Sequence, residues 1–364
     1  MALQVDFQKH RLDFTFSAGT SRGVLRHKYT WIIRIFDDEC PDVYGLGEAA
    51  PLVNLSIDDL PDFEQRLLNI CDKISGKPAP RDTTEAYMLL DEQVPDGLPS
   101  IYFGLEVALI DLMNGGDRMI YDNEFSRGIK GIPINGLVWM GALEDMLFQI
   151  TEKVDEGFDC IKVKIGSMDF EKECDLLQYI RNKYYKKEIT LRVDANGAFS
   201  PEEAMGKLSQ LAKYKIHSIE QPIKDGQLGA MNRLCETSPI PIALDEELIG
   251  KYTLASKKAL LNAVKPQFII LKPTLVGGLR ASQQWIALAQ ELNIGWWMTS
   301  ALESNIGLNA ISQFTAEYNV DLPQGLGTGK LYHNNLDSPL TIENGNIYYR
   351  KPLDWDFSLL TQFQ

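Results

Sequence analysis

The stretch CIKVKIG, residues 160–166, combines the apolar run of a buried strand with two lysines at alternate positions. Side chains on a strand point alternately to its two faces, so Lys162 and Lys164 share one face while Ile161 and Val163 share the other. Two neighbouring ammonium groups repel each other and resist burial. We therefore expect the apolar face to pack against helices and the lysine face to border a site that holds negative charge.

The same rhythm of a short apolar strand and an amphipathic helix repeats from about residue 131, at a spacing of roughly 25–30 residues. One helix start is well marked, because SPEE at residues 200–203 combines an N-cap serine, a proline and a capping-box glutamate. Eight units predict an α/β fold, a (β/α)₈ barrel of the TIM type with a modified last helix and with functional groups at the strand C-terminal ends. The predicted strands are IPINGLVW, DCIKVKI, ITLRVDA, IHSIEQ, PIALDE, QFIILKP, IGWWMTS and NVDLPQG.

The first part of the chain has a different organisation, in which strand-like stretches precede helical ones. LQVDFQKHRLDFTF, KYTWIIRIFDD and DVYGLGEAAPL alternate as antiparallel strands do. Helical patterns follow at about 57–75, 83–92 and 99–114. We therefore predict an α+β capping domain at residues 1–130, the barrel at 131–330 and a tail at 331–364. The tail contains NGN, which is typical of a hairpin turn, and is expected to return to the capping domain and complete it.

The composition of the 364 residues limits the classes of partner. The net charge of 36 − 50 = −14 argues against nucleic-acid binding, which needs basic surfaces, but a local lysine cluster still permits a small anionic substrate. The charged N-terminus predicts no signal peptide, and no apolar run approaches the roughly 18 residues that cross a membrane. Five scattered cysteines without C-x-x-C spacing indicate a reduced, cytoplasmic protein. The oligomeric state stays open.

Charged residues end five consecutive predicted strands: Lys164, Asp194, Glu220, Asp245 and Lys272. Their intervals are 194 − 164 = 30, 220 − 194 = 26, 245 − 220 = 25 and 272 − 245 = 27 residues, which is one strand and helix each time. A single carboxylate at a strand end is commonly a helix cap or a loop anchor. Three on adjacent strands of a closed barrel would repel one another, and a hard divalent cation such as Mg²⁺ would relieve that repulsion.

The motifs KVKIG, RVDANGAF, IEQP, ALDEEL and ILKPTLVGGL together resemble the enolase superfamily, in particular its muconate-lactonising subgroup. The resemblance implies that Asp194, Glu220 and Asp245 bind Mg²⁺, with Mn²⁺ as a possible substitute. It also implies that Lys164 and Lys272 flank the substrate as acid and base groups. The mandelate-racemase subgroup is disfavoured, because it would carry a histidine on the seventh strand, where this chain has WWMTSALES.

The shared step of that superfamily is removal of a proton next to a carboxylate, and we predict Lys164 as its base. Lys162 is expected to bind the substrate carboxylate and to disfavour protonation of Lys164, or alternatively only to pair with a carboxylate. Arg192 lies two residues before Asp194 on the same strand face and is expected to support the metal ligands from behind, as is Glu246. Asn196 is expected to orient a ligand or contact the substrate.

Within the subgroup, dipeptide epimerases carry Asp-x-Asp on the eighth strand, where this chain has LPQGLGTGKLY. Its glycines, such as Gly327, offer free N–H groups to an anionic tail. With INGLVWMG and SALESNIGLNAI, this segment resembles members that dehydrate 2-succinyl-6-hydroxy-2,4-cyclohexadiene-1-carboxylate to o-succinylbenzoate in menaquinone biosynthesis. The alternatives are N-acylamino-acid racemisation, dipeptide epimerisation and cycloisomerisation. Ser300 and Glu303 in SALES are also predicted to contact substrate.

The loop SAGTSRGVLRHKY at residues 17–29 is rich in Gly, Ser and Thr, and we predict that it forms a lid over the barrel. Ser21 and Arg22 within it are predicted to contact substrate, and Glu48 in GLGEAAP to have a structural role. A Schiff-base aldolase would also use a strand-end lysine, but it would not need three carboxylates and EDTA would not inhibit it.

Overall fold

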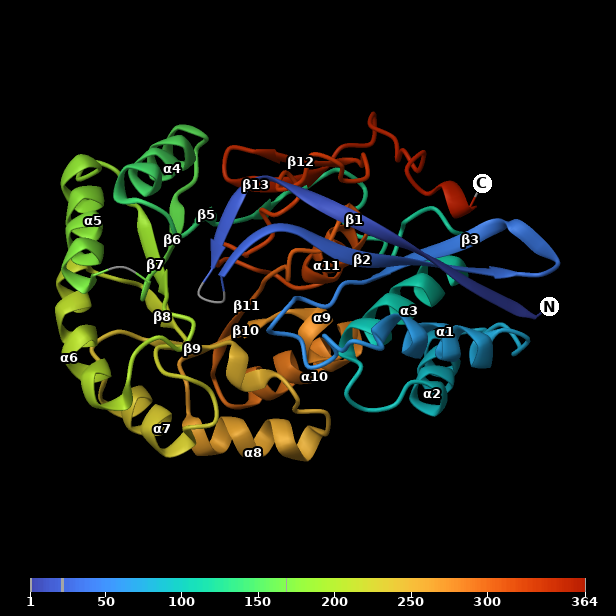
Figure 1. The fold of residues 1–364 in the computed structure, drawn as a ribbon, viewed down its shortest axis with the longest axis horizontal. Helices are drawn as coiled ribbons and strands as arrows, with labels where there is room; N and C mark the ends of the chain where they lie inside the picture. The colour runs from blue at the N-terminus through green and yellow to red at the C-terminus, as the bar shows by residue number, and fades with distance from the viewer. Residues whose placement is uncertain (1, 21–22, 168, 364) are drawn as a thin grey trace.

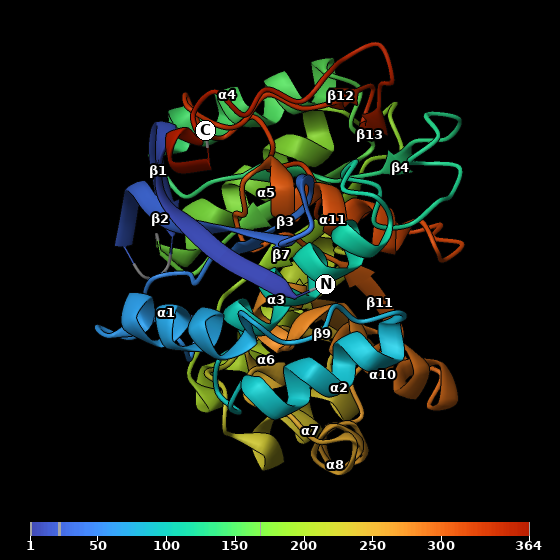
Figure 2. The same cartoon turned by 90° about the vertical axis from the view of Figure 1, so that its right-hand side faces the viewer.

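The structure is a computed structural model that describes residues 2–20, 23–167 and 169–363. A capping domain of strands and helices lies beside a barrel whose helices line the opposite side of the molecule (Figure 1). The view turned by 90° shows β1 and β2 above α1 and α2, with the barrel helices behind them (Figure 2). The fold class predicted from the sequence is thus confirmed, with the differences given below.

The capping domain is an antiparallel sheet covered by helices. Its strands run in the order β1-β2-β3, and α3 packs closely on β3. A Cβ at Gly47 would overlap the carbonyl of Gly104, and one at Gly45 would overlap that of Ala108, so both β3 glycines are needed for this close approach. The elements are β1 (Leu3–Thr20), β2 (Gly23–Asp37), β3 (Cys40–Ala49), α1 (Phe63–Ile74), α2 (Thr83–Gln93) and α3 (Pro99–Met113).

The barrel wall is a parallel sheet of seven strands, counted over the described residues, in the order β11-β10-β9-β8-β7-β6-β5. The strands are β5 (Gly136–Val138), β6 (Cys160–Lys164), β7 (Thr190–Asp194), β8 (Ser218–Glu220), β9 (Ile242–Leu244), β10 (Phe268–Leu271) and β11 (Gly295–Met298). The helices outside them are α4 (Leu143–Asp155), α5 (Phe170–Lys183), α6 (Pro201–Leu211), α7 (Leu228–Thr237), α8 (Leu254–Val264), α9 (Pro273–Val276), α10 (Gly278–Glu291) and α11 (Asn305–Thr315). The predicted capping box at Ser200 is present at the start of α6.

The predicted eighth strand is reduced to two residues that close the ring. Gln324 forms a parallel bridge to Ile134, just before β5, and Gly325 forms one to Thr299, just after β11. The backbone N–H of Gln324 donates to the Pro133 carbonyl at 2.8 Å. Residues 326–339 contain no helix, so an irregular segment takes the place of the eighth helix. This segment contains several glycines, which disfavour helix formation.

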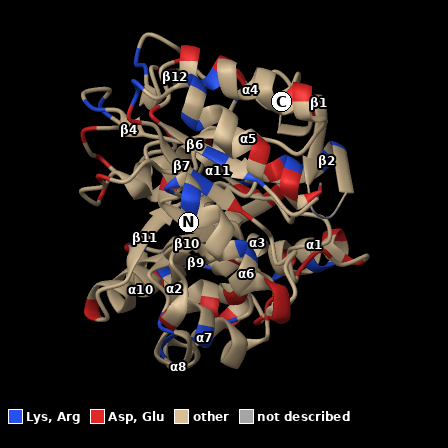
Figure 3. Cartoon of the chain, turned by 90° about the vertical axis from the view of Figure 1, so that its left-hand side faces the viewer, with Lys and Arg blue, Asp and Glu red and all other residues tan. Residues whose placement is uncertain are grey.

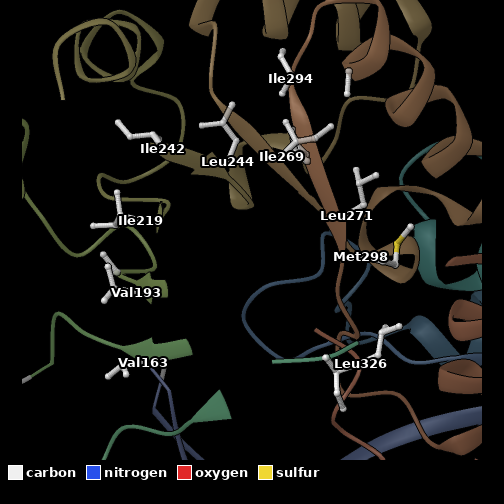
Figure 4. Close-up of a cluster of buried hydrophobic side chains, with 14 of the residues drawn as sticks. Val163, Val193, Ile219, Ile242, Leu244, Ile269, Leu271, Ile294, Met298 and Leu326 are labelled. Carbon is white, nitrogen blue, oxygen red and sulfur yellow. The ribbon is translucent and has the colours of Figure 1, made fainter. Parts of the chain in front are cut away.

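Alternation of side chains separates the two faces of the barrel wall. Val163, Val193 and Ile219 on successive strands belong to the large buried cluster that includes the helix side chains (Figure 4). Trp297 and Ile270 instead form a smaller buried cluster with Ala243. The lysine face of β6 alternates with the apolar face, as the sequence predicts.

The tail pairs first with β1, where the Thr15 N–H donates to the Leu331 carbonyl at 2.8 Å, then with the segment before the first barrel strand, and finally packs on the capping sheet. Strands β12 (Leu340–Glu343) and β13 (Asn346–Tyr349) form a hairpin, and β13 pairs with β4 (Ile132–Pro133). The turn residues Asn344 and Gly345 both have positive φ, 48° and 68°, as a tight hairpin turn requires. Leu360 and its neighbours then pack in one cluster with Ile32 and Leu46.

Charge is distributed over both domains, with acidic and basic segments interspersed on the face shown in Figure 3. The described helices include none with the length and apolar character needed to cross a membrane. All five cysteines are unpaired thiols.

Candidate active site

Strand register brings the charged strand ends together. Lys164 at the end of β6 is level with Asp194 at the end of β7, and Asp194 is level with Glu220 at the end of β8. Asp245 directly follows β9, and Lys272 directly follows β10. All five predicted residues therefore meet at one end of the barrel, where parallel strands present their C-terminal ends.

Lysine ammonium groups lie between the carboxylates. Lys162 contacts Asp194 at 3.1 Å and also contacts Glu220. Lys164 lies 3.3 Å from Asp194, and Lys272 contacts Asp245 and lies 3.7 Å from Glu220. The carboxylate side chains are at most 3% exposed and those of the lysines at most 12%. Three positive and three negative groups thus offset one another in a mostly buried setting.

Burial and ion pairing have opposite effects on the pKa values of these groups. Burial disfavours the charged form of Lys162, but the Asp194 and Glu220 carboxylates outweigh it and raise the lysine's pKa. Burial also opposes the charge on Lys272, whose pKa is nevertheless raised by Asp245 and Glu220. Burial raises the pKa of Asp245 to about 6 against the effect of Lys272, and the nearby Glu220 carboxylate adds to the rise.

The carboxylates offer the donor set of a hard divalent cation, although lysines occupy the space among them. Among the described residues, no group of three His, Cys, Asp or Glu side chains is already arranged to hold a metal ion. Neither carboxylate oxygen of Glu220 has a hydrogen bond of normal geometry, although both are buried and lie near ammonium groups. Asp194, Glu220 and Asp245 therefore fit a cation such as Mg²⁺ chemically, and the ammonium groups would have to move aside for it.

A cavity of about 760 Å³ opens above this cluster. Lys162, Lys164 and Lys272 line it from the barrel, together with residues of β1, of the segment 52–55 and of β5. Phe16 and Trp139, in T-shaped contact at 5.7 Å, form part of its apolar wall. The capping domain thus contributes to the same cavity as the strand ends.

The structure brings three further predicted residues to the cavity: Asn196, Ser300 and Gly327 line it. The Asn196 amide oxygen accepts a hydrogen bond from Lys164 at 2.9 Å, and its amide nitrogen donates to Glu246 at 3.1 Å. Glu246 is therefore linked to the lysine cluster through Asn196. Ser21 and Arg22 lie outside the described residues.

The predicted substrate contact of Glu303 needs correction, because this side chain does not line the cavity. It is fully buried and accepts hydrogen bonds from Thr274 and Ser300, each at 2.5 Å, and from the Ala301 N–H at 2.7 Å. Both oxygens are thus already bonded within the protein, and Glu303 holds Ser300 in place instead.

Arg192, which is expected to support the metal ligands from behind, is bonded to another polar group inside the barrel. Its guanidinium donates to the Pro323 carbonyl at 2.6 Å and stacks on the Trp297 ring at 4.0 Å. Within the described residues it forms no ion pair with the strand-end carboxylates, although it lies level with Lys162, which does. Its hydrogen bond and its ring contact lie inside the barrel, and its charge interacts with that of Glu220.

A second buried charge cluster joins the domains, and of its members the sequence predicted only a structural role for Glu48. Lys28 on β2 donates to the Leu302 carbonyl at 3.0 Å, and Glu48 on β3 accepts from the Ser304 N–H at 2.7 Å. Burial lowers the pKa of Lys28, and the carboxylates of Glu48 and Glu303 oppose that effect. The signal was present in KYTWII, where Lys28 shares a strand face with the buried Ile32, much as Lys162 alternates with apolar residues.

Comparison with known proteins places this geometry in a family. Residues 145–352 match the family model described as enolase C-terminal domain-like. An o-succinylbenzoate synthase from Desulfotalea psychrophila is 44% identical, over 94% of this chain and 98% of that protein. The chain belongs to the o-succinylbenzoate synthase family of the enolase superfamily.

Solved structures agree with that membership. The crystal structure of MenC from Desulfotalea psychrophila superposes with a TM-score of 0.86 at 40% identity, covering 96% of this chain and all of that one. A more distant relative, an N-succinylamino acid racemase from Thermus thermophilus, is 26% identical over 82% of this chain and 76% of its own. Enzymes of the enolase superfamily use a divalent metal ion, typically Mg²⁺.

Proposed function

We propose that this chain catalyses the dehydration of 2-succinyl-6-hydroxy-2,4-cyclohexadiene-1-carboxylate to o-succinylbenzoate in menaquinone biosynthesis, with Mg²⁺ as its cofactor. The observation that carries the proposal is the placement of Lys164 and Lys272 in one cavity, with Asp194, Glu220 and Asp245 on the strands between them. Similarity to o-succinylbenzoate synthases over nearly the whole chain selects the reaction. The cytoplasm is the proposed location.

Lys164 is proposed as the base that removes the proton next to the substrate carboxylate. Its ammonium nitrogen is held by Asn196 and Asp194 and faces the cavity. A proton taken from C1 and returned to the leaving C6 hydroxyl gives water, while the remaining electron pair completes the aromatic ring. One lysine on one face is enough for this elimination.

Lys272 and Lys162 are proposed to stabilise the negative charge that develops on the substrate. Both lysines line the cavity, so they present positive charge where the substrate carboxylate is proposed to bind. Asp194, Glu220 and Asp245 would hold Mg²⁺, or Mn²⁺ in its place, which when bound supplies Lewis-acid stabilisation of the substrate carboxylate.

The distal succinyl carboxylate is proposed to bind near Ser300 and Gly327. Both line the cavity, and the Ser300 hydroxyl is held between Glu303 and Thr328. Ser21 and Arg22 stay proposed substrate contacts of the capping domain.

An ultraviolet assay of cyclohexadiene loss tests the proposal directly. The native protein should turn over the substrate with Mg²⁺, and EDTA should abolish turnover until Mg²⁺ is added in excess. Absence of turnover with Mg²⁺ present would refute the assignment.

Racemisation of N-acylamino acids is the second candidate, because the Thermus thermophilus relative has that activity by name. It would use Lys164 and Lys272 on opposite faces of one carbon. Incubation of N-succinylamino acids in D₂O would reveal it as exchange at the α carbon. Exchange much faster than dehydration would make racemisation the main activity. Dipeptides can be tested in the same way, and muconate by formation of its lactone.

A further inference from the structure

Gln221, next to Glu220 in the IEQP motif, has an unusual backbone for a residue with a side chain. Its φ is +39°, in the left-handed region, and the residue is fully buried. A conformation of this kind persists only where surrounding contacts hold it. The contacts of Gln221 connect the loops that follow β7, β8 and β9, three adjacent strands of the barrel (Figure 1).

The side chain of Gln221 reaches the loop of Asp245. Its amide oxygen accepts hydrogen bonds from the Asp245 N–H at 3.2 Å and from the Glu247 N–H at 3.4 Å. Its amide nitrogen donates to the Ile223 carbonyl at 3.0 Å and lies 3.4 Å from a Glu247 carboxylate oxygen. Each polar atom of the amide thus has two partners, so its orientation is defined.

The backbone of Gln221 ties in the third loop. Its carbonyl accepts from the Gly197 N–H at 2.6 Å, three residues beyond Asp194, and its own N–H donates to the Ala243 carbonyl at 2.9 Å. One residue therefore fixes the spacing of all three strand ends that carry the carboxylates.

We propose that Gln221 is a positioning residue that holds Asp194, Glu220 and Asp245 at the spacing that a divalent cation requires. This inference rests on the proposed function of those carboxylates as metal ligands. Groups that orient ligands from behind typically change metal affinity by about 10–100-fold when removed. The prediction concerns the affinity for metal in the absence of substrate, so it does not depend on turnover.

The main test compares two glutamine-to-methionine variants. Gln313 on α11 is a matched control, because it is equally buried and its amide oxygen accepts from the Ile120 and Tyr121 N–H groups at 2.8 and 3.0 Å. Free Mn²⁺ is measured by electron paramagnetic resonance during titration of the full-length protein, and thermal unfolding is measured with EDTA. Gln221→Met should weaken Mn²⁺ binding about tenfold or more, whereas Gln313→Met should lower stability without changing Mn²⁺ affinity.

Substrate kinetics give a second readout. At saturating Mn²⁺ the kcat of Gln221→Met should return to within about threefold of native, because the catalytic lysines are untouched, while the Mn²⁺ concentration for half-activity rises. If Gln221→Met binds Mn²⁺ as tightly as native protein, or if Gln313→Met weakens binding equally, the positioning role is wrong.

Gln221→Glu decides the question if the methionine variant does not fold. The added negative charge alone would tighten cation binding, whereas the lost amide donor and repulsion from Glu247 would displace the side chain. The positioning role predicts Mn²⁺ binding weaker by about threefold or more, and equal or tighter binding contradicts it. Two other outcomes would instead refute the proposed metal site itself: native protein that binds no Mn²⁺, or an Asp245→Asn variant that binds Mn²⁺ as tightly as native protein.

Discussion

The two lysines proposed to flank the substrate, Lys164 and Lys272, have different surroundings. Lys164 is held by Asn196 and Asp194, whereas Lys272 is held by Asp245 and Glu220. Elimination on one face needs one base, while racemisation needs a proton-transfer group on each face. The roles can therefore be separated by substitutions that keep the positive charge.

Arginine at each position provides that test, because it stays protonated and cannot act as a base near neutral pH. We expect Lys164→Arg to lower kcat for dehydration by about 100-fold or more, the scale of general base catalysis. Lys272→Arg should lower it much less. Lys207→Arg, on α6 and paired with Glu203, serves as the control. Equal losses from both cavity variants would mean that Lys272 also transfers a proton.

A third lysine, Lys257 on α8, is buried without a carboxylate partner among the described residues. Its ammonium donates to Gln284 at 2.7 Å and to the Ala281 carbonyl at 3.3 Å. Burial lowers its pKa from 10.5 to about 8, and Arg280 adds to the effect. That difference corresponds to roughly 3 kcal/mol against folding at neutral pH, at 1.36 kcal/mol per pKa unit.

Lys257→Met should therefore stabilise the protein at pH 7, by about 1–2 kcal/mol once the lost hydrogen bonds are subtracted. Between pH 8 and 10.5, Lys257 is protonated in the unfolded chain but has lost its proton in the native protein. The unfolded state therefore binds more protons, and native stability rises with pH across that window. The advantage of the variant should be constant below pH 8 and shrink toward pH 10.5. Urea unfolding measures both, with Lys258→Met, exposed and paired with Glu291, as control. A destabilised variant at pH 7 would show that hydrogen bonding outweighs burial.

At the scale of elements, the contact between β3 and the start of α11 joins the capping domain to the barrel. Glu48 is fully buried and accepts hydrogen bonds from Thr30, from both the N–H and the hydroxyl of Ser304, and from the Gly307 N–H, at 2.6–2.9 Å. Its carboxylate thus satisfies two of the N–H groups at the N-terminus of α11, those of Ser304 and Gly307.

Glu48→Ala should lower the free energy of unfolding by about 3–5 kcal/mol, because it removes the acceptor of four buried hydrogen bonds and one of the two carboxylates that offset the charge of Lys28. Denaturant unfolding followed by circular dichroism checks this value. Glu343→Ala, which removes an exposed pair with Arg350, should change stability by less than about 1 kcal/mol. A loss below about 1 kcal/mol at Glu48 would argue against its role as the link between the domains.

The elements themselves were largely predictable, since periodicity and caps are local signals. The strands at CIKVKI and TLRVD and the helix after SPEE begin and end near the expected residues. The predicted eighth strand was too long, because the strand-like pattern before PQG covers only a few residues. Its actual extent depends on partners at Ile134 and Thr299, which are distant in the chain.

At the scale of the whole molecule, the proposed catalytic cluster joins strand ends of the barrel, and the cavity above it also includes residues of the capping domain. We expect EDTA to abolish dehydration and to lower the unfolding midpoint, and Mg²⁺ or Mn²⁺ to restore both. A ligand at 100 times its Kd stabilises the folded state by about 2.7 kcal/mol, which calorimetry resolves. Unchanged unfolding with and without metal would contradict cation binding at Asp194, Glu220 and Asp245.

The sequence by itself determined that Lys162, Lys164 and the strand-end carboxylates share the interior of a barrel, because alternation and a regular repeat are properties of neighbouring residues. Only the tertiary structure decided that Glu303 is closed off by Thr274 and Ser300, and that Arg192 stacks on Trp297. Pairing of buried charges depends on distances between residues far apart in the chain. A single sequence shows which buried charges need a partner, but it does not show which residue becomes the partner of each charge.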